Sequence, residues 1–189
     1  MTTRPLTYRA QQATWSLEFT QAALSTLSAN VQRGAWSRES VGQLYTRDFA
    51  PTCVKVELVT KLVPKWSAFA RVQFDVDDAM RERERLFDEG LFCIGLWHSH
   101  PQRRPVPSSE DLELAANHGK AARHQLNGLV FAIVGTSPFP EGLGVWLHDG
   151  HQPVQLLPDG EHHERAVLEP ERTLQSCGGN ADGLAARRR

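Results

Sequence analysis

Two histidines and an aspartate lie close together in the middle of the chain. One residue separates His98 from His100, and Asp111 follows eleven residues after His100. Two imidazoles and one carboxylate can hold a catalytic zinc ion that keeps the fourth corner of its tetrahedron open for water. We therefore predict that these three residues bind one Zn²⁺ per chain.

The segment before the histidines indicates how they are positioned. Residues 91–97 are a nearly unbroken apolar run, which is typical of a strand buried on both faces. Residues i and i+2 of a strand point to the same face and lie roughly 6.6 Å apart. Both imidazoles at the end of this strand can therefore reach one ion, whereas Ser99 points away and is given no role.

The third ligand is expected at the start of a helix. Three prolines between His100 and Ser108 prevent regular strand pairing. Ser108 is a good N-cap, and Glu110 and Asp111 form an acidic first turn. A His-x-His pair alone can simply end a strand, and such a helix start alone is ordinary. Their combination favours the metal site.

The His-Ser-His-Pro and Pro-Ser-Ser-Glu-Asp segments resemble the JAMM signature of JAB/MPN-domain metalloproteases. Active members also need an upstream glutamate, which opens a Glu-Thr/Ser-x-Gly-x-Leu strand in the prokaryotic JAB group. Residues 39–45, Glu-Ser-Val-Gly-Gln-Leu-Tyr, match that strand. The resemblance covers residues 20–147, and its three elements agree in order and spacing.

The resemblance implies a role for each site residue. His98, His100 and Asp111 would hold zinc, whose bound water has a pKa of about 7. Glu39 would take a proton from that water and deliver it to the leaving amine. Ser108 would donate a hydrogen bond to the oxyanion that develops on the attacked carbonyl.

The resemblance also implies a substrate and partners. The substrate would be the peptide or isopeptide bond after the C-terminal glycine of a ubiquitin-like protein. An extended tail of that protein could add a strand to an exposed sheet edge. Prokaryotic relatives are similar to peptidases encoded beside E1-like and E2-like enzymes in anti-phage defence operons. We therefore expect deconjugation or maturation of such a modifier.

Four other functions stay open. The same hydrolase could process a sulfur-carrier protein or a carrier-bound amino acid. A DNA-repair-associated branch shares the Pro-x-Pro-Ser-x-x-Asp half, matched by residues 105–111, but usually has Asn where this chain has Ser99. The last two are a non-catalytic MPN scaffold, although every ligand is present here, and a zinc protein with little or no turnover.

The composition limits the class of protein. A length of 189 residues suits one domain, and 40% hydrophobic with 23% charged residues is ordinary for a globular protein. The net charge of −1 gives no basic field that would attract nucleic acid. Three cysteines without a Cys-x-x-Cys pair, and no long apolar run, predict a cytoplasmic protein without a membrane span.

We expect an α/β fold, as a single JAB/MPN-like domain with a mixed, curved β-sheet flanked by helices in a cytidine-deaminase-like layering. The domain is expected over residues 14–157. Residues 1–13 are expected to form a flexible N-terminus, and residues 158–189 a disordered C-terminal tail.

The periodicity of the sequence predicts the elements of this domain. Helices are expected over residues 20–34, 78–89 and 109–123. Strands are expected over residues 15–19, 39–46, 53–63, 68–74, 91–97, 129–134, 145–147 and 154–157. The strand at 129–134 is expected to be central and the last one to lie at an edge. Val76, Met80, Phe87 and Leu112 are expected to face the core, and His148 to lie at the surface with the other histidines outside the motif.

Overall fold

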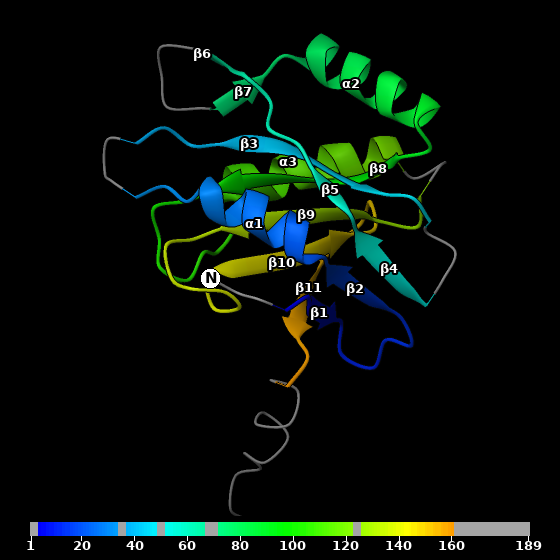
Figure 1. Cartoon of the computed structure of the whole chain (residues 1–189), viewed down its shortest axis with the longest axis vertical. Helices are drawn as coiled ribbons and strands as arrows, with labels where there is room; N and C mark the ends of the chain where they lie inside the picture. Colours follow the sequence, from blue (N-terminus) through cyan, green and yellow to red (C-terminus); the bar gives the residue numbers. More distant parts are fainter. Residues whose placement is uncertain (1–3, 34–36, 49–51, 67–71, 123–125, 161–189) are drawn as a thin grey trace, which may run out of the picture.

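The computed structural model describes residues 4–33, 37–48, 52–66, 72–122 and 126–160 (Figure 1). The helices are α1 (Gln21–Ala29), α2 (Val76–Asp88) and α3 (Ser109–Ala122). The strands are β1 (Leu6–Arg9), β2 (Ser16–Phe19), β3 (Val41–Thr46), β4 (Cys53–Val56), β5 (Leu58–Val59), β6 (Pro64–Trp66), β7 (Val72–Phe74), β8 (Phe92–Ser99), β9 (Leu129–Val134), β10 (Leu143–His148) and β11 (Pro153–Pro158). Within these ranges no helix is long and apolar enough to cross a lipid bilayer.

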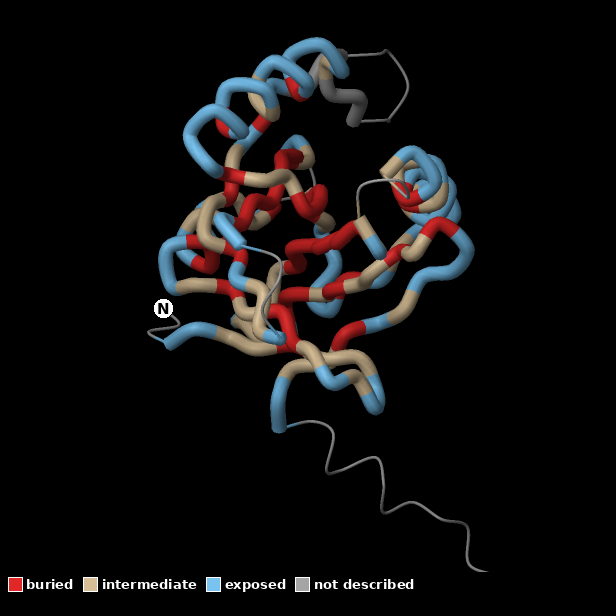
Figure 2. The backbone as a smooth tube through the Cα atoms, turned by 90° about the vertical axis from the view of Figure 1, so that its right-hand side faces the viewer, coloured by how far each residue is buried: buried red, intermediate tan, exposed pale blue. Residues whose placement is uncertain are grey.

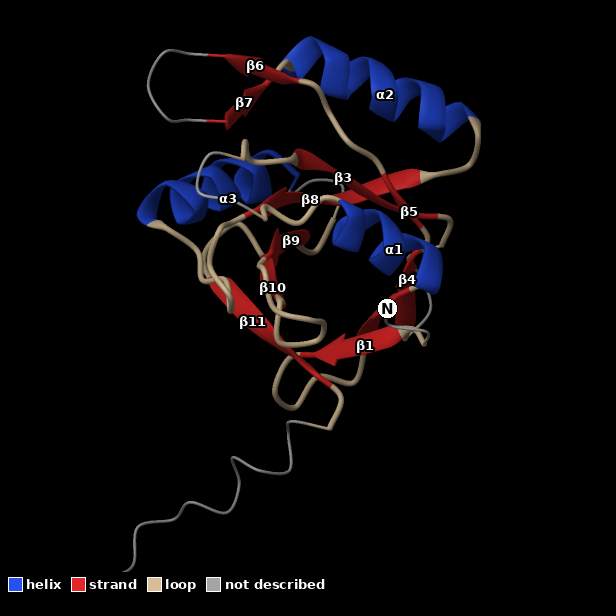
Figure 3. Ribbon diagram, turned by 60° about the vertical axis from the view of Figure 1, so that its left-hand side comes forward, coloured by secondary structure: helices blue, strands red, loops and turns tan. Residues whose placement is uncertain are grey.

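The main sheet curves until it is nearly closed (Figure 3). Its nine strands follow the order β4, β2, β1, β11, β10, β9, β8, β3 and β5. Most neighbours are antiparallel, but β8 runs parallel to β9, and β2 runs parallel to β4. Helix α1 lies inside the curve, whereas α2 and α3 lie outside it. The predicted α/β fold with a mixed, curved sheet flanked by helices is therefore confirmed.

The main hydrophobic core fills the concave side of the sheet. Leu24 and Leu27 of α1 belong to one cluster with Phe19, Trp97 and Leu156, which come from strands far apart in the sequence. Each of these side chains is 2% exposed or less, and Figure 2 shows the buried stretches in the interior of the molecule. Because burial of one such side chain contributes about 1.5–3 kcal/mol, this cluster holds the sheet in its curved form.

Outside the curve, β8, α3 and β9 form a parallel strand–helix–strand unit. Ala115 of α3 packs on Leu96 and Phe131, which lie on neighbouring strands. All six residues of β9 are buried, and the strand lies between β8 and β10, so its predicted central position is confirmed. This unit carries the two segments on which the metal ligands were predicted.

The prediction of a flexible N-terminus is wrong for Leu6–Arg9. This segment forms β1, which pairs with both β2 and β11, and Tyr8 within it is only 1% exposed. Strand β11 therefore lies inside the sheet, whereas the sequence suggested a position at its edge. Four residues with one buried aromatic ring give too short an alternation to predict a strand, because the strand is stabilised by its two neighbours.

The start of the predicted C-terminal tail is also ordered against β1. The backbone N–H of Asp159 donates to the carbonyl of Thr7 (2.8 Å), and the Asp159 carboxylate accepts from the Arg9 guanidinium (3.0 Å). The remainder of that tail, residues 161–189, lies outside the described residues.

Two predicted strands differ from the structure in their bounds. The strand predicted over 53–63 is divided, because β4 pairs with β2 whereas β5 pairs with β3 on the opposite edge of the sheet. Of the strand predicted over 68–74, residues 68–71 lie outside the described residues, and residues 72–74 form β7. Among the described strands β7 pairs with β6, in a separate two-stranded sheet beside α2 (Figure 1).

Helix α2 presents a different face to the sheet than its apolar pattern predicts. Val76 is 64%, Met80 46% and Phe87 62% exposed, whereas Ala79 and Leu86 are buried. The face that packs on the sheet is rotated about a quarter turn around the helix axis from this exposed apolar stripe, and it includes Glu82.

Glu82 explains the orientation of α2. Its Oε1 accepts hydrogen bonds from the side chains of Gln43 (2.9 Å), Tyr45 (3.0 Å) and Thr60 (2.6 Å). Gln43 and Tyr45 are fully buried, so they would lose these partners if the helix turned its apolar stripe inward. Satisfying buried polar groups therefore decides which face of α2 packs on β3.

His148 is buried, with 2% of its surface exposed, although the sequence analysis assigned it to the surface. It ends β10, and its Nδ1 accepts a hydrogen bond from the N–H of Gly150 (3.0 Å). Burial lowers the pKa of His148, because the charged imidazolium is poorly solvated there.

We predict that this histidine makes folding stability depend on pH. The unfolded chain takes up the proton near pH 6.5 and the folded chain only at lower pH, so stability falls as the pH drops through that window. The variant His148→Asn keeps a hydrogen-bond acceptor but does not titrate. Urea unfolding at about pH 7.5 and about pH 5.5 should show a smaller loss of unfolding free energy for the variant than for the parent. Equal losses would contradict the prediction.

Candidate metal centre

The two histidines are positioned by the end of β8. The strand reaches Ser99, two residues further than the apolar run indicates, so His98 lies inside it and His100 directly after it. The N–H of His100 donates to the carbonyl of Val134 (2.8 Å), which keeps the chain beside β9 beyond the last strand residue. Because side chains alternate along a strand, both imidazoles lie on the outer face of the sheet.

The proline-containing spacer after His100 is held against the loop that follows β9. The N–H groups of Thr136 and Ser137 donate to the carbonyls of Gln102 (2.8 Å) and Arg103 (3.1 Å). A Cβ on Gly135 would lie 2.6 Å from the Gln102 carbonyl oxygen, so only glycine fits at this position. The spacer is thereby fixed at its first turn before it leads to α3.

Asp111 is oriented by the cap of α3. The N–H and the hydroxyl of Ser108 both donate to Asp111 Oδ2 (2.7 and 2.8 Å), and Ser108 Oγ accepts from the Asp111 N–H (3.2 Å). This is the reciprocal pattern of a capping box, with aspartate at the third helical position. The helix start predicted at Ser108 is confirmed, and the same contacts direct the carboxylate toward β8.

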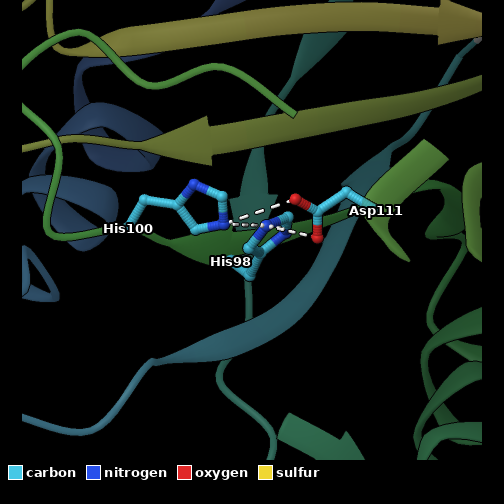
Figure 4. Close-up of side chains that lie close together, drawn as sticks. All are labelled: His98, His100 and Asp111. Carbon is cyan, nitrogen blue, oxygen red and sulfur yellow. Dashed lines mark hydrogen bonds and ion pairs between the residues drawn. The ribbon is translucent and has the colours of Figure 1, made fainter. Parts of the chain in front are cut away.

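The structure brings the three predicted ligands together (Figure 4). The two Nε2 atoms of His98 and His100 lie 3.0 Å apart. Asp111 Oδ1 lies 3.1 Å from the Nε2 of His98, and Oδ2 lies 3.4 Å from the Nε2 of His100. A tetrahedral zinc ion with ligand bonds of 2.0–2.2 Å requires neighbouring donors about 3.3 Å apart. The three residues therefore fit a zinc ion by donor type and by spacing.

The electrostatics of the cluster agree with a cation site. The side chains of His98, His100 and Asp111 are only 17%, 12% and 19% exposed. A hydrogen bond to Asp111 is the main cause that raises the pKa of His100. Burial alone would raise the pKa of Asp111, but hydrogen bonds from both imidazoles lower it far below its usual range. The carboxylate is thus negatively charged and available as a ligand at neutral pH.

Glu39 lines the same cavity as the three ligands, but it is not part of the metal-binding group. It precedes β3, which begins at Val41 and not at Glu39 as the sequence suggested. The negative charge of the Glu39 carboxylate is a lesser cause of the raised pKa of His100, after the hydrogen bond and the charge of Asp111. The structure therefore provides a carboxylate beside the ligand set, on a different element.

Ser99 connects the ligand strand to the Glu39 segment. Its Oγ accepts from the N–H of Ser40 (2.8 Å), and its N–H donates to the Ser40 carbonyl (2.9 Å). Ser99 is fully buried, and the adjacent residues Val41 and His98 are paired in the sheet. Sequence reasoning gave Ser99 no role, since strand alternation only shows that it points away from the metal ligands.

We predict that zinc binding depends on the three ligands and not on histidines elsewhere. The variant His98→Ala removes one of three protein ligands and should lose the stoichiometric zinc that the parent protein holds at about one ion per chain. Metal analysis after dialysis measures this. His151→Ala, which changes an exposed loop histidine, is the matched control and should keep its zinc. Equal zinc content in His98→Ala and the control would contradict the site.

The chain is similar to solved structures and to one protein-family model. The solution structure of a Desulfitobacterium hafniense protein matches with a TM-score of 0.53 and 21% identity, over 72% of this chain and 87% of that chain. A Salinibacter ruber solution structure matches with a TM-score of 0.44 and 20% identity, over 68% and 79%. No curated protein matches.

The family model described as prokaryotic homologs of the JAB domain matches residues 20–146, which is more than half of the chain. The matched range includes the glutamate, both histidines, the serine and the aspartate of the site. With its single mixed α/β domain, the chain belongs to the family of prokaryotic JAB-domain homologs.

Proposed function

We propose that this protein is a zinc-dependent peptidase or isopeptidase of the JAMM type. The observation that carries the proposal is the set of donor distances between His98, His100 and Asp111, 3.0–3.4 Å, in a cavity that also contains Glu39. Three ligands leave one corner of a zinc tetrahedron for water, which is the composition of a catalytic site and not of a closed structural one.

Bound zinc and Glu39 would carry out different steps of amide hydrolysis. Bound zinc supplies Lewis acidity and makes water nucleophilic at neutral pH. Glu39 takes one proton from the attacking water, whose oxygen bonds to the carbonyl carbon. Glu39 then delivers that proton to the amine nitrogen as the C–N bond breaks. The products are a carboxylic acid and a free amine.

Ser108 is the proposed donor to the oxyanion. Its hydroxyl donates to Asp111 Oδ2, so it can turn to the substrate only by giving up that bond. The backbone N–H of Ser108 donates to the same oxygen and still holds the carboxylate when the hydroxyl turns. The cap therefore permits Ser108 to serve the substrate without releasing the ligand.

We propose that the substrate is the bond after the C-terminal glycine of a ubiquitin-like protein, within a bacterial conjugation system that includes E1-like and E2-like enzymes. Membership of the JAB family and the resemblance of the site segments to JAMM peptidases support this substrate. An extended tail can add to a strand edge. Among the described strands, β4 and β5 end the main sheet, and β6 and β7 are both edges of the two-stranded sheet.

We predict that Glu39→Gln retains zinc and loses turnover. An amide cannot take the proton, so kcat should fall by about 10²–10⁴. The measurement is cleavage of ubiquitin-like proteins, including a sulfur-carrier protein, each fused through its last glycine to a reporter, with and without a chelator. Glu110→Gln changes an exposed carboxylate of the same cavity and should stay active. Failure of the zinc-loaded parent to cleave any fusion, or full activity of Glu39→Gln, would refute the proposal.

We also predict that Ser99 positions Glu39 through Ser40. Ser99→Ala removes the acceptor for the Ser40 N–H. It should lower kcat and leave zinc content and KM unchanged, because the ligands and the cavity walls are intact. Ser99→Thr keeps the hydroxyl and should restore kcat. If Ser99→Ala loses zinc, or if threonine gives no recovery, Ser99 is only a structural residue.

A further inference from the structure

The metal centre occupies one end of a larger cavity. The cavity has a volume of about 600 Å³ and extends from Glu39 and the two histidines to Trp146 of β10. Beyond the metal ligands its lining includes the apolar side chains of Leu96, Phe131 and Ile133, together with polar residues such as Glu113, Asn117 and His148. Hydrolysis at the metal needs none of these side chains, so this part of the cavity has no role in the chemistry described above.

The register of the strands explains why these residues lie together. His98 pairs with Ile133, and Ile133 pairs with Gly144, so these residues form one row across the sheet. Paired residues point to the same face. In the next row Leu96, Phe131 and Trp146 are paired, so Trp146 also faces α3. An apolar row therefore lies directly beside the row that carries a metal ligand.

Gly144 brings the Trp146 ring closer to the metal. A Cβ on Gly144 would lie 2.4 Å from Cη2 and 2.5 Å from Cζ3 of the indole. The ring is thus folded back over Gly144, into the row that contains His98. Only glycine at position 144 leaves room for the indole ring. Trp146 is half-buried where it forms the wall of the cavity.

Helix α3 closes the cavity on the opposite side and leaves it open near the metal. A Cβ on Gly119 would lie 2.9 Å from the Nδ1 of His148, so the second half of the helix lies tight against β10. In the first half, Leu112 lines the cavity and is 40% exposed. The apolar wall of the helix is therefore accessible where the scissile bond would lie.

We propose that the apolar part of the cavity, formed by Phe131, Ile133, Trp146 and Leu112, is a specificity subsite for one bulky apolar side chain of the substrate. The proposal rests on the proposed peptidase function, because it is the continuity of the cavity with the metal centre that makes a substrate polypeptide its occupant. Two strand spacings and one row separate the Cα atoms of His98 and Trp146, which is roughly 12 Å. An extended chain covers that distance in about three residues. The Trp146 ring is folded back toward His98, which shortens the distance to the wall of the subsite. The apolar side chain of the substrate is therefore expected two or three residues from the scissile bond.

Quenched fluorescent peptides that contain a Gly-Gly bond test the subsite. Leu, Phe, Ala or Asp is placed at each of the three positions on either side of that bond. The expected result is a kcat/KM at least tenfold higher for Leu or Phe than for Asp at one of these positions. Trp146→Ala should remove this preference. Phe87→Ala, an exposed aromatic residue outside the cavity, is the matched control and should keep the preference.

Two further measurements keep the test decisive. Leu112→Ser changes the opposite wall at an exposed helical position, so it tests the subsite even if Trp146→Ala does not fold. Binding of uncleavable peptides to the zinc-loaded protein, followed by the Trp146 indole N–H signal in ¹H–¹⁵N spectra, reports on the subsite without turnover.

The outcomes separate the subsite from the proposed function. Cleavage without any preference between Leu and Asp, or a preference that both Trp146→Ala and Leu112→Ser retain, overturns the subsite and leaves the peptidase standing. Selective binding of the Leu or Phe peptide at Trp146 in a protein that cleaves nothing supports the subsite and overturns the peptidase.

Discussion

Two imidazoles and one carboxylate have to present their ligand atoms to a single ion, at distances of 3.0–3.4 Å from one side chain to the next, and most of the surrounding structure serves that constraint. Two imidazole nitrogens and a carboxylate oxygen would separate if they were borne by flexible loops. Here the histidines end a strand that is hydrogen-bonded on both sides, and the aspartate is locked by the capping box of α3. The rigidity of two regular elements therefore acts together with the contacts between the imidazoles and the carboxylate to keep the three ligands in place.

The rest of the fold positions those two elements. The core on the concave side holds β8 and β9 in place through residues such as Trp97, and α3 crosses over them with small residues at its contacts. Helix α2 is fixed by the three hydrogen bonds to Glu82, two of them donated from β3. The strand that follows Glu39 is thus held from its outer face as well as by β8. Ligands and proposed base belong to one continuous, well-packed unit.

The sequence was informative where chemistry and periodicity coincide. The ligands, the buried strand before them and the helix start at Ser108 were predictable, because each carries a local signal that needs no tertiary information. The face of α2 was not, since Glu82 accepts hydrogen bonds from β3 and the following segment, which no helical pattern reveals. Strand β1 and the burial of His148 likewise depend on neighbours distant in sequence. Ser99 shows the same limit, because its partner Ser40 lies 59 residues away.

The pairing of β1 with β11 brings the two ends of the described part of the chain together. Asp159 is hydrogen-bonded to Thr7, and four strand spacings, roughly 19 Å, separate β1 from β8. The chain therefore enters and leaves the described part of the domain at neighbouring places, four strands along the sheet from the strand that carries His98. Adjacent ends of this kind also suit circular permutation, or insertion of the whole domain into a loop of another protein.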